Sequence, residues 1–207
     1  MRKICNYLIK SILAGVMIAV GGTVFLSCES KVVGALFFAI GLFVICARSL
    51  NLYTGKVGYI FDNKPVYLVE VFVTIIGNFI GTLAVGTVLR FTRIYPAISE
   101  KAAGICQAKL DDTVLGIFVL SVMCGMLMYL AVNGYRDYKH ELSKVLSVFL
   151  CVIVFILCGF EHSIANMYYF SVAAMWGAKS FGYMGIMILG NAAGGVIFPL
   201  CKKLIKE

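Results

Sequence analysis

Charged residues are scarce in this sequence, and acidic residues are the rarer kind. Only 14% of the 207 residues are charged and 61% are hydrophobic. In soluble domains about 25% of residues are charged and about 45–50% are apolar. This composition excludes a water-soluble globule and a disordered tail. The 18 Lys and Arg residues exceed the 10 Asp and Glu residues, but in so apolar a chain the excess is typical of cytoplasmic loops and not of phosphate contacts. We therefore predict an integral membrane protein, embedded in the lipid bilayer, with no nucleic-acid partner.

Motifs for cofactor and metal chemistry are also missing. The eight cysteines include no CxxC pair and mostly lie within apolar runs, where they act as small hydrophobic residues. No GxxxxGK[ST] phosphate loop occurs. We expect no cofactor, no metal and no disulfide.

Long uncharged stretches mark the candidate membrane spans. A helix needs about 20 apolar residues to cross the hydrocarbon layer. Four stretches are long enough with modest extension into the headgroups, namely 11–28, 71–89, 113–135 and 180–201. Three others are too short on their own: 32–47, 145–160 and 163–178.

Polar residues follow two of these short stretches at bilayer depth. Arg48 and Asn51 follow the first, and Glu161 and His162 follow the second, before apolar sequence resumes. Non-helical backbone in a bilayer is tolerated only where protein or a water-filled cavity surrounds it. We interpret both segments as helices broken partway through the membrane. The fold class is then all-α, with six transmembrane helices of which helices 2 and 5 are broken.

An internal repeat relates the two halves of the chain. The pattern GNxxG occurs at Gly77–Gly81 and again at Gly190–Gly194, 113 residues later, and Arg48 and Glu161 are separated by the same number. A three-span unit that is duplicated must be inverted in its second copy. The alternative is small-residue helix packing that arose twice. We predict one membrane domain over 1–207, built from repeat one at about 7–90, a basic connecting segment at 90–110 and repeat two at about 110–203.

The distribution of Lys and Arg predicts that both termini are cytoplasmic. With the N-terminus inside, the outer side holds six basic residues, four of them in segment 90–109. The cytoplasmic side then holds ten: Arg2, Lys3, Lys10, Lys64, Arg136, Lys139, Lys144, Lys202, Lys203 and Lys206.

The two breaks contain the polar and ionisable residues that could take part in function. An ionisable residue at the centre of a membrane helix costs about 2.5–3.5 kcal/mol, so Glu161 and His162 need compensation. We expect Glu161 to turn into the protein and hold backbone amides, supported by Asn166, while His162 faces a lumen. The alternative is that His162 only bonds between helices. In the first break, Asn51 supports the backbone.

The first break also offers a hydroxyl group. Gly55 can adopt the left-handed backbone of a tight loop, and Thr54 before it can donate its hydroxyl into the lumen. Taken alone, Thr54 could equally be an ordinary turn residue.

Four segments resemble one known family. Gly159–Met167 (GFEHSIANM) is similar to the signature of the formate/nitrite transporter family, Leu52–Gly55 (LYTG) resembles its loop motif, and the GNxxG pair resembles its third and sixth helices. The resemblance implies a homopentamer in the inner (plasma) membrane, with an aquaporin-like bundle and a pore in each protomer. It implies a channel for small monovalent anions, namely formate, nitrite or hydrosulfide, without identifying which.

The resemblance also implies roles for individual residues. His162 matches the central pore histidine, Thr54 its facing threonine, and Lys109 the vestibule lysine. Three apolar positions match the residues that narrow the pore: Phe38, Leu42 and Phe155. Two positions depart from the family pattern, since Gly125 replaces a frequent Asn and Asn133 a usual Trp.

These roles suggest how permeation works. The basic outer segment, Lys109 above all, would concentrate the anion, and Thr54 and His162 would hydrogen-bond it between two apolar gates. Protonation by His162 or by water would let the neutral acid cross, because burying a free anion is costly. Two alternatives remain, a proton-coupled anion carrier and an intramembrane enzyme that uses Glu161 and His162 as an acid/base pair.

Overall fold

The computed structural model describes residues 2–205, with side chains from Ile4 onward. Arg2, Lys3 and Lys206, counted above for orientation, lie outside the described side chains. Every regular element in this range is a helix, as predicted. The α-helices are α1 (Arg2–Ser27), α2 (Lys31–Ala47), α3 (Tyr53–Lys56), α4 (Tyr67–Val88), α5 (Tyr95–Asp111), α6 (Val114–Asp137), α7 (Glu141–Cys158), α8 (Ser163–Val172) and α9 (Ala178–Leu204), and the 3₁₀ helices are η1 (Val57–Asp62) and η2 (Leu89–Phe91).

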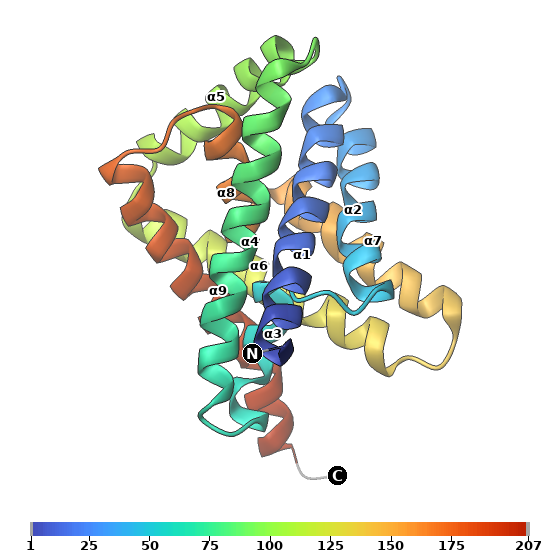
Figure 1. Cartoon of the computed structure of the whole chain (residues 1–207). Helices are drawn as coiled ribbons and strands as arrows, with labels where there is room; N and C mark the ends of the chain where they lie inside the picture. The colour runs from blue at the N-terminus through green and yellow to red at the C-terminus, as the bar shows by residue number, and fades with distance from the viewer. Residues whose placement is uncertain (1, 206–207) are drawn as a thin grey trace.

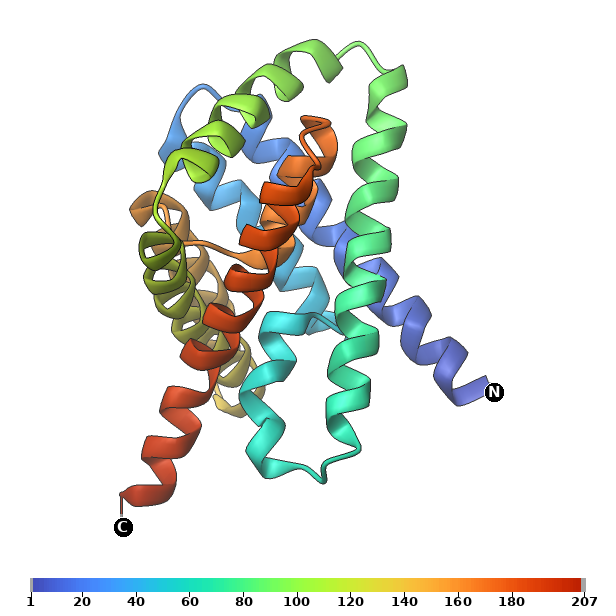
Figure 2. The ribbon, with the colours of Figure 1, turned by 90° about the vertical axis from the view of Figure 1, so that its left-hand side faces the viewer.

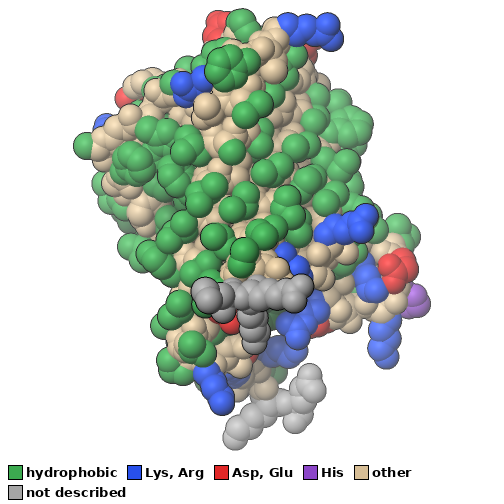
Figure 3. All heavy atoms as spheres, viewed as in Figure 1, with side chains coloured by type: hydrophobic (Ala, Val, Ile, Leu, Met, Phe, Trp, Pro, Cys, Tyr) green, Lys and Arg blue, Asp and Glu red, His purple; other side chains and the backbone are tan. Residues whose placement is uncertain are grey.

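The surface of the bundle is apolar over most of its height. Figure 3 shows hydrophobic side chains covering the middle of the molecule, with Lys and Arg gathered toward its two ends. Five helical segments are long and apolar enough to cross a membrane: Ile4–Ser27, Tyr67–Phe91, Val114–Asp137, Glu141–Cys158 and Ala178–Leu204. With 17 residues, α2 is shorter. This pattern is that of an integral membrane protein.

The helices pack as two similar groups. In one group α1 contacts α4 and α2, and in the other α6 contacts α9 and α7. The short helix α8 packs beside α4 inside the bundle. Both termini lie at the same end (Figure 1). At the opposite end, α5 crosses over the bundle (Figure 2), so the basic connecting segment 90–110 is mostly helical.

Two interruptions lie inside the bundle, one between α2 and α3 and the other between α7 and α8. Each begins with the same turn, in which a left-handed residue lets the next N–H reach back five residues to a helix carbonyl. In the first, Ser49 has φ +50° and Leu50 N–H donates to Ile45 O at 2.9 Å. In the second, Gly159 has φ +70° and Phe160 N–H donates to Phe155 O at 2.9 Å.

The left-handed residue of the first interruption was predicted wrongly. Gly55 lies within α3 and has no positive φ. Its role is steric, because a Cβ there would press against Val132 of α6. Ser49 adopts the left-handed conformation instead, because the turn at the C-terminus of α2 requires it.

The asparagines of the two GNxxG motifs hold these interruptions in place. Asn78 donates to the carbonyls of Ser11 and Asn51 and accepts from Tyr53 N–H, at 2.7–2.9 Å. Asn191 makes the corresponding bonds to Ser121 O, Glu161 O and Ser163 N–H, at 2.8–2.9 Å. Each side chain thus bridges a non-helical segment and a neighbouring helix.

The hydrogen-bond partners of the two asparagines do not keep the 113-residue spacing expected from the sequence. The asparagines are 113 residues apart, but Ser11, Asn51 and Tyr53 correspond to residues 110 later. Glu161 therefore corresponds to Asn51 and not to Arg48, which is the C-cap of α2. The break region and the GNxxG motif are separated by three more residues in the second half.

Candidate functional site

The two interruptions bring Thr54 and His162 together in the interior. Thr54 Oγ1 lies 3.0 Å from His162 Nε2, and the side chains are fully buried or nearly so. His162 Nδ1 accepts the N–H of Ala165 at 3.0 Å, where it caps the N-terminus of α8. With Nδ1 acting as acceptor, the neutral ring carries its proton on Nε2 and donates it to Thr54. The hydroxyl proton of Thr54 then stays available to another acceptor.

Aromatic rings surround the imidazole. Phe155 stacks on His162 with ring centroids 5.6 Å apart, and Phe38 meets the edge of Phe155 at 5.8 Å. Leu42 lies one helical turn after Phe38 on α2 and is also buried. The three predicted apolar residues therefore belong to the same buried region as the polar pair.

Glu161 points to a different set of partners. Its two carboxylate oxygens accept from Lys109 Nζ at 2.8 and 2.6 Å, and one also accepts from Asn166 Nδ2. The prediction that this carboxylate holds backbone amides was wrong. The reason is that the ammonium of Lys109, in the last turn of α5, bonds both carboxylate oxygens of Glu161 in place of backbone amides. Asn51 does support the first break. Its backbone carbonyl accepts from Asn78 Nδ2, and its side-chain amide donates to Tyr7 O.

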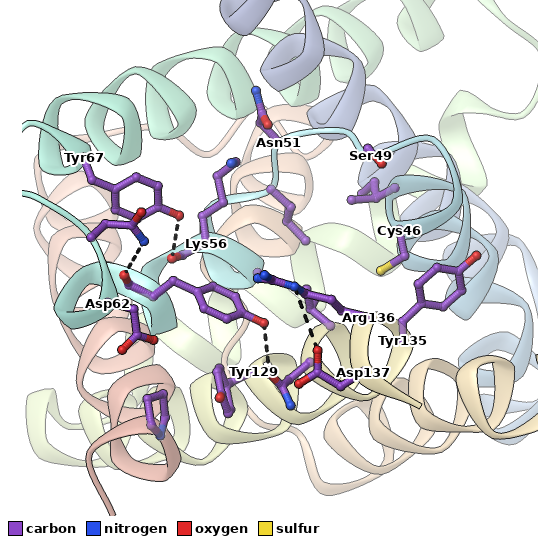
Figure 4. Close-up of a pocket in the computed structure, with 18 of the residues that line it drawn as sticks. Cys46, Ser49, Asn51, Lys56, Asp62, Tyr67, Tyr129, Tyr135, Arg136 and Asp137 are labelled. Atoms are coloured by element: carbon purple, nitrogen blue, oxygen red, sulfur yellow. Dashed lines mark hydrogen bonds and ion pairs between the residues drawn. The ribbon is translucent and has the colours of Figure 1, made fainter. Parts of the chain in front are cut away.

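Two cavities approach the Thr54–His162 pair, and no described residue lines both. The small cavity, about 370 Å³, is lined by Lys31, Lys109, Glu161, Phe155 and His162 among others. The large cavity, about 1070 Å³, is lined by Gly55 and Lys56, the two residues after Thr54, and by polar residues of η1 and α6 (Figure 4). His162 and Phe155 thus face the small cavity, and Thr54, bonded to His162, directly precedes Gly55 of the large cavity.

Lys31, which lines the small cavity, and two basic residues of the segment 90–110 bind backbone carbonyls. Lys31 donates to Leu157 O, Lys101 to Cys28 O and Arg90 to Ser171 O, each at about 3 Å and each near the C-terminus of a helix. Each of these carbonyls lies near the end of a helix, where a cation opposes the negative end of the helix dipole. In the segment 90–110, Arg90 and Lys101 thus bind helix ends, and Lys109 pairs with Glu161.

Sequence reasoning missed Lys31 and Lys56 as cavity residues. Lys31 is the first residue of α2, and nothing in its surroundings in the sequence marks it. Lys56 was missed as well, although it follows Thr54 by two positions. That proximity was the one available signal.

The two departures from the family pattern lie in different environments. At Gly125 an added Cβ would overlap the backbone carbonyl of Asn191, so this position lets α6 approach α9 closely. Asn133 lines the large cavity and accepts a hydrogen bond from Tyr59 Oη at 3.2 Å.

Comparison with known proteins assigns the chain to a transport family. A family model described as formate/nitrite transporter matches residues 1–204. The uncharacterized transporter YrhG of Bacillus subtilis is 28% identical over 185 residues, covering 82% of this chain and 69% of that protein. The formate channel FocB of Escherichia coli is 22% identical over 250 residues, covering 99% and 88%.

A solved structure has the same fold. It is described as a pentameric formate channel with formate bound, and it matches with a TM-score of 0.79, 23% identity and coverage of 98% of this chain and 97% of that chain. The matched proteins are transporters and channels, so the acid/base enzyme considered for Glu161 and His162 is not supported. The chain is a membrane transport protein and belongs to the formate/nitrite transporter family.

Proposed function

We propose that the protein is a channel for a small monovalent anion of a weak acid, with formate or nitrite as first candidates and hydrosulfide as a third. The observation that carries the proposal is the hydrogen bond between Thr54 Oγ1 and His162 Nε2 at the closed point between two cavities. A relative and a structural neighbour that are described as formate channels support formate.

The buried pair defines how an anion can pass. With Nε2–H bound to Thr54, the threonine hydroxyl can donate to an anion that arrives at the pair. Phe38, Leu42 and Phe155 supply no partner for a charge, and an unpaired anion in such surroundings is costly. The anion therefore crosses this layer as the neutral acid, after taking a proton from water on the side from which it enters. Flux consequently rises as the outside pH falls toward the pKa of the acid.

We further propose the architecture predicted above, with six spans in two inverted halves and spans 2 and 5 broken. The spans are α1, α2 with α3–η1, α4, α6, α7 with α8, and α9. The recurrence of the turns at Ser49 and Gly159, and of the bonds of Asn78 and Asn191, supports this arrangement. Both termini and the large cavity face the cytoplasm of the plasma membrane in this proposal, and the small cavity faces outward. We also propose that the protein assembles as a homopentamer. The pentameric structural neighbour supports this proposal.

The test replaces the imidazole. Wild type and His162→Phe are reconstituted in liposomes, and formate, nitrite and hydrosulfide uptake is measured between pH 5 and 8. We expect the variant to lose flux or to invert its pH dependence, because the phenyl ring cannot donate to Thr54. His162→Phe with unchanged flux and an unchanged pH profile would remove His162 from permeation.

A carrier and a channel differ in current. Reconstitution into planar bilayers at high anion concentration gives unitary current steps from a channel, whereas a proton-coupled carrier gives only strictly stoichiometric exchange. We expect current steps.

A further inference from the structure

The large cavity contains a lysine, Lys56, that makes no direct ion pair with a described carboxylate, although the charge of Glu70 on α4 acts on it from a distance. Among the described residues, no carboxylate oxygen lies within 4.0 Å of Lys56 Nζ, and no hydrogen-bond acceptor lies within 3.5 Å. The ammonium instead lies 5.2 Å from the ring centroid of Tyr7 and 5.8 Å from that of Tyr67. Its side chain is half-buried and lines the cavity (Figure 4). In this respect Lys56 differs from Lys109, whose charge Glu161 offsets.

The backbone fixes Lys56 next to the polar pair. Lys56 is the last residue of α3, and Thr54 is two positions before it in the same four-residue helix. Tyr67 Oη donates to the Lys56 carbonyl at 3.1 Å, which ties α3 to α4. Lys56 therefore lines the large cavity two residues along the chain from the threonine of the polar pair.

A second cation reaches into the same cavity. Figure 4 shows Arg136 extending from α6 toward the interior of the pocket, where its guanidinium lies 5.4 Å from the ring centroid of Tyr59. Its one carboxylate neighbour, Asp137, is 3.9 Å away and both side chains are largely exposed, so water screens that pair. The large cavity has four Lys or Arg residues and two Asp residues, whereas the small cavity has two Lys residues against one Asp and one Glu.

From these observations we infer that Lys56, assisted by Arg136, is an anion-binding site at the inner end of the large cavity, selective for a small carboxylate or oxyanion. The site rests on the proposed channel function and adds the point at which the anion is held beside the pore. The rings of Tyr7 and Tyr67 give the ammonium cation–π contacts, and Glu70 does not contact it directly. A monovalent anion is the partner that completes the set.

The experiment separates binding from passage. The formate C–H proton is observed by saturation-transfer NMR with purified protein in detergent, and formate uptake is measured in liposomes over a range of concentrations. Lys56→Met keeps the apolar stem and removes the charge, and Lys56→Arg keeps the charge. Lys202→Met removes a matched charge from the exposed rim of the same cavity.

We expect Lys56→Met to lose the formate signal and to raise the half-saturating formate concentration about fivefold to tenfold, as loss of one partly screened charge contact predicts. Arg136→Gln has a smaller effect in the same direction, and Lys56→Arg and Lys202→Met stay within about twofold of wild type. A Lys56→Met protein that binds and transports formate like wild type overturns the site. Equal losses in Lys56→Met and Lys56→Arg overturn it as well, because they indicate a packing role.

The channel proposal fails on a different result. If wild type carries none of formate, nitrite and hydrosulfide, the proposed function is wrong, while the binding measurement on Lys56→Met still decides whether the cavity holds an anion. His162→Phe should keep the formate signal, because its ring lines the small cavity and not the large one.

Discussion

The Glu161 carboxylate depends on nitrogen donors from two other positions. Its side chain is 5% exposed and that of Lys109 is 14% exposed, so the ion pair is largely withdrawn from water. The second donor to the carboxylate is Asn166 Nδ2, which lies on α8 five residues after Glu161. Removing one member of such a pair leaves an uncompensated charge, which costs more than the pair itself contributes.

We predict that Glu161→Gln lowers the free energy of unfolding by about 3 kcal/mol. The glutamine NH2 group cannot accept a hydrogen bond, so it leaves Lys109 Nζ or Asn166 Nδ2 without its acceptor, and the charge of Lys109 is no longer offset. Lys109→Met should cost a similar amount, and the double variant should cost clearly less than the sum. Denaturant titration in detergent micelles measures all three. Strictly additive losses would show that the two residues do not stabilise each other.

At the level of elements, side-chain amides replace the backbone bonds that the broken helices lack. Buried N–H and C=O groups must be paired, and Asn191 pairs three of them across α6, α8 and the segment between α7 and α8. The GNxxG motif therefore combines close helix contact with a bridge to non-helical backbone.

We predict that Asn191→Leu, which is similar in volume, lowers the free energy of unfolding by more than about 3 kcal/mol because three buried polar groups lose their partner. Asn133→Leu is the control. It removes a single bond beside the large cavity and should cost less than about 1 kcal/mol. Thermal unfolding of the purified proteins in detergent compares them, and a similar loss in both would contradict the bridging role of Asn191.

The same elements show what sequence could and could not predict. The stretches 32–47 and 145–160 approximate α2 and α7, because charges interrupt apolar runs where the helices end. The helix α5 was missed because its basic residues conceal it in hydropathy. The Lys109–Glu161 pair joins residues 52 positions apart, and no local pattern encodes such a contact. The left-handed Ser49 was missed because glycine is the usual residue there.

At the scale of the whole molecule, one chain supplies every part of the proposed pore. Both cavities, the Thr54–His162 pair and the apolar residues around it come from one chain. Exposed apolar side chains cover the outside, for example Phe72 on α4 and Leu150 on α7. This outer surface can face lipid or a neighbouring copy without contributing to the pore. A pentamer would therefore contain five independent pores.

Independence of the pores predicts a linear response to mixing. Wild type and His162→Phe are coexpressed with different tags at varied ratios, the mixed assemblies are isolated, and formate flux is measured at the pH where the variant alone is least active. If each protomer conducts through its own cavities, flux falls in proportion to the fraction of variant subunits, because one altered imidazole closes one path only. A single path shared by five subunits would make flux fall roughly as the fifth power of the wild-type fraction. That steep curve would contradict a pore within each protomer, and it would move the conducting path to an interface between copies where Thr54 and His162 have no direct role.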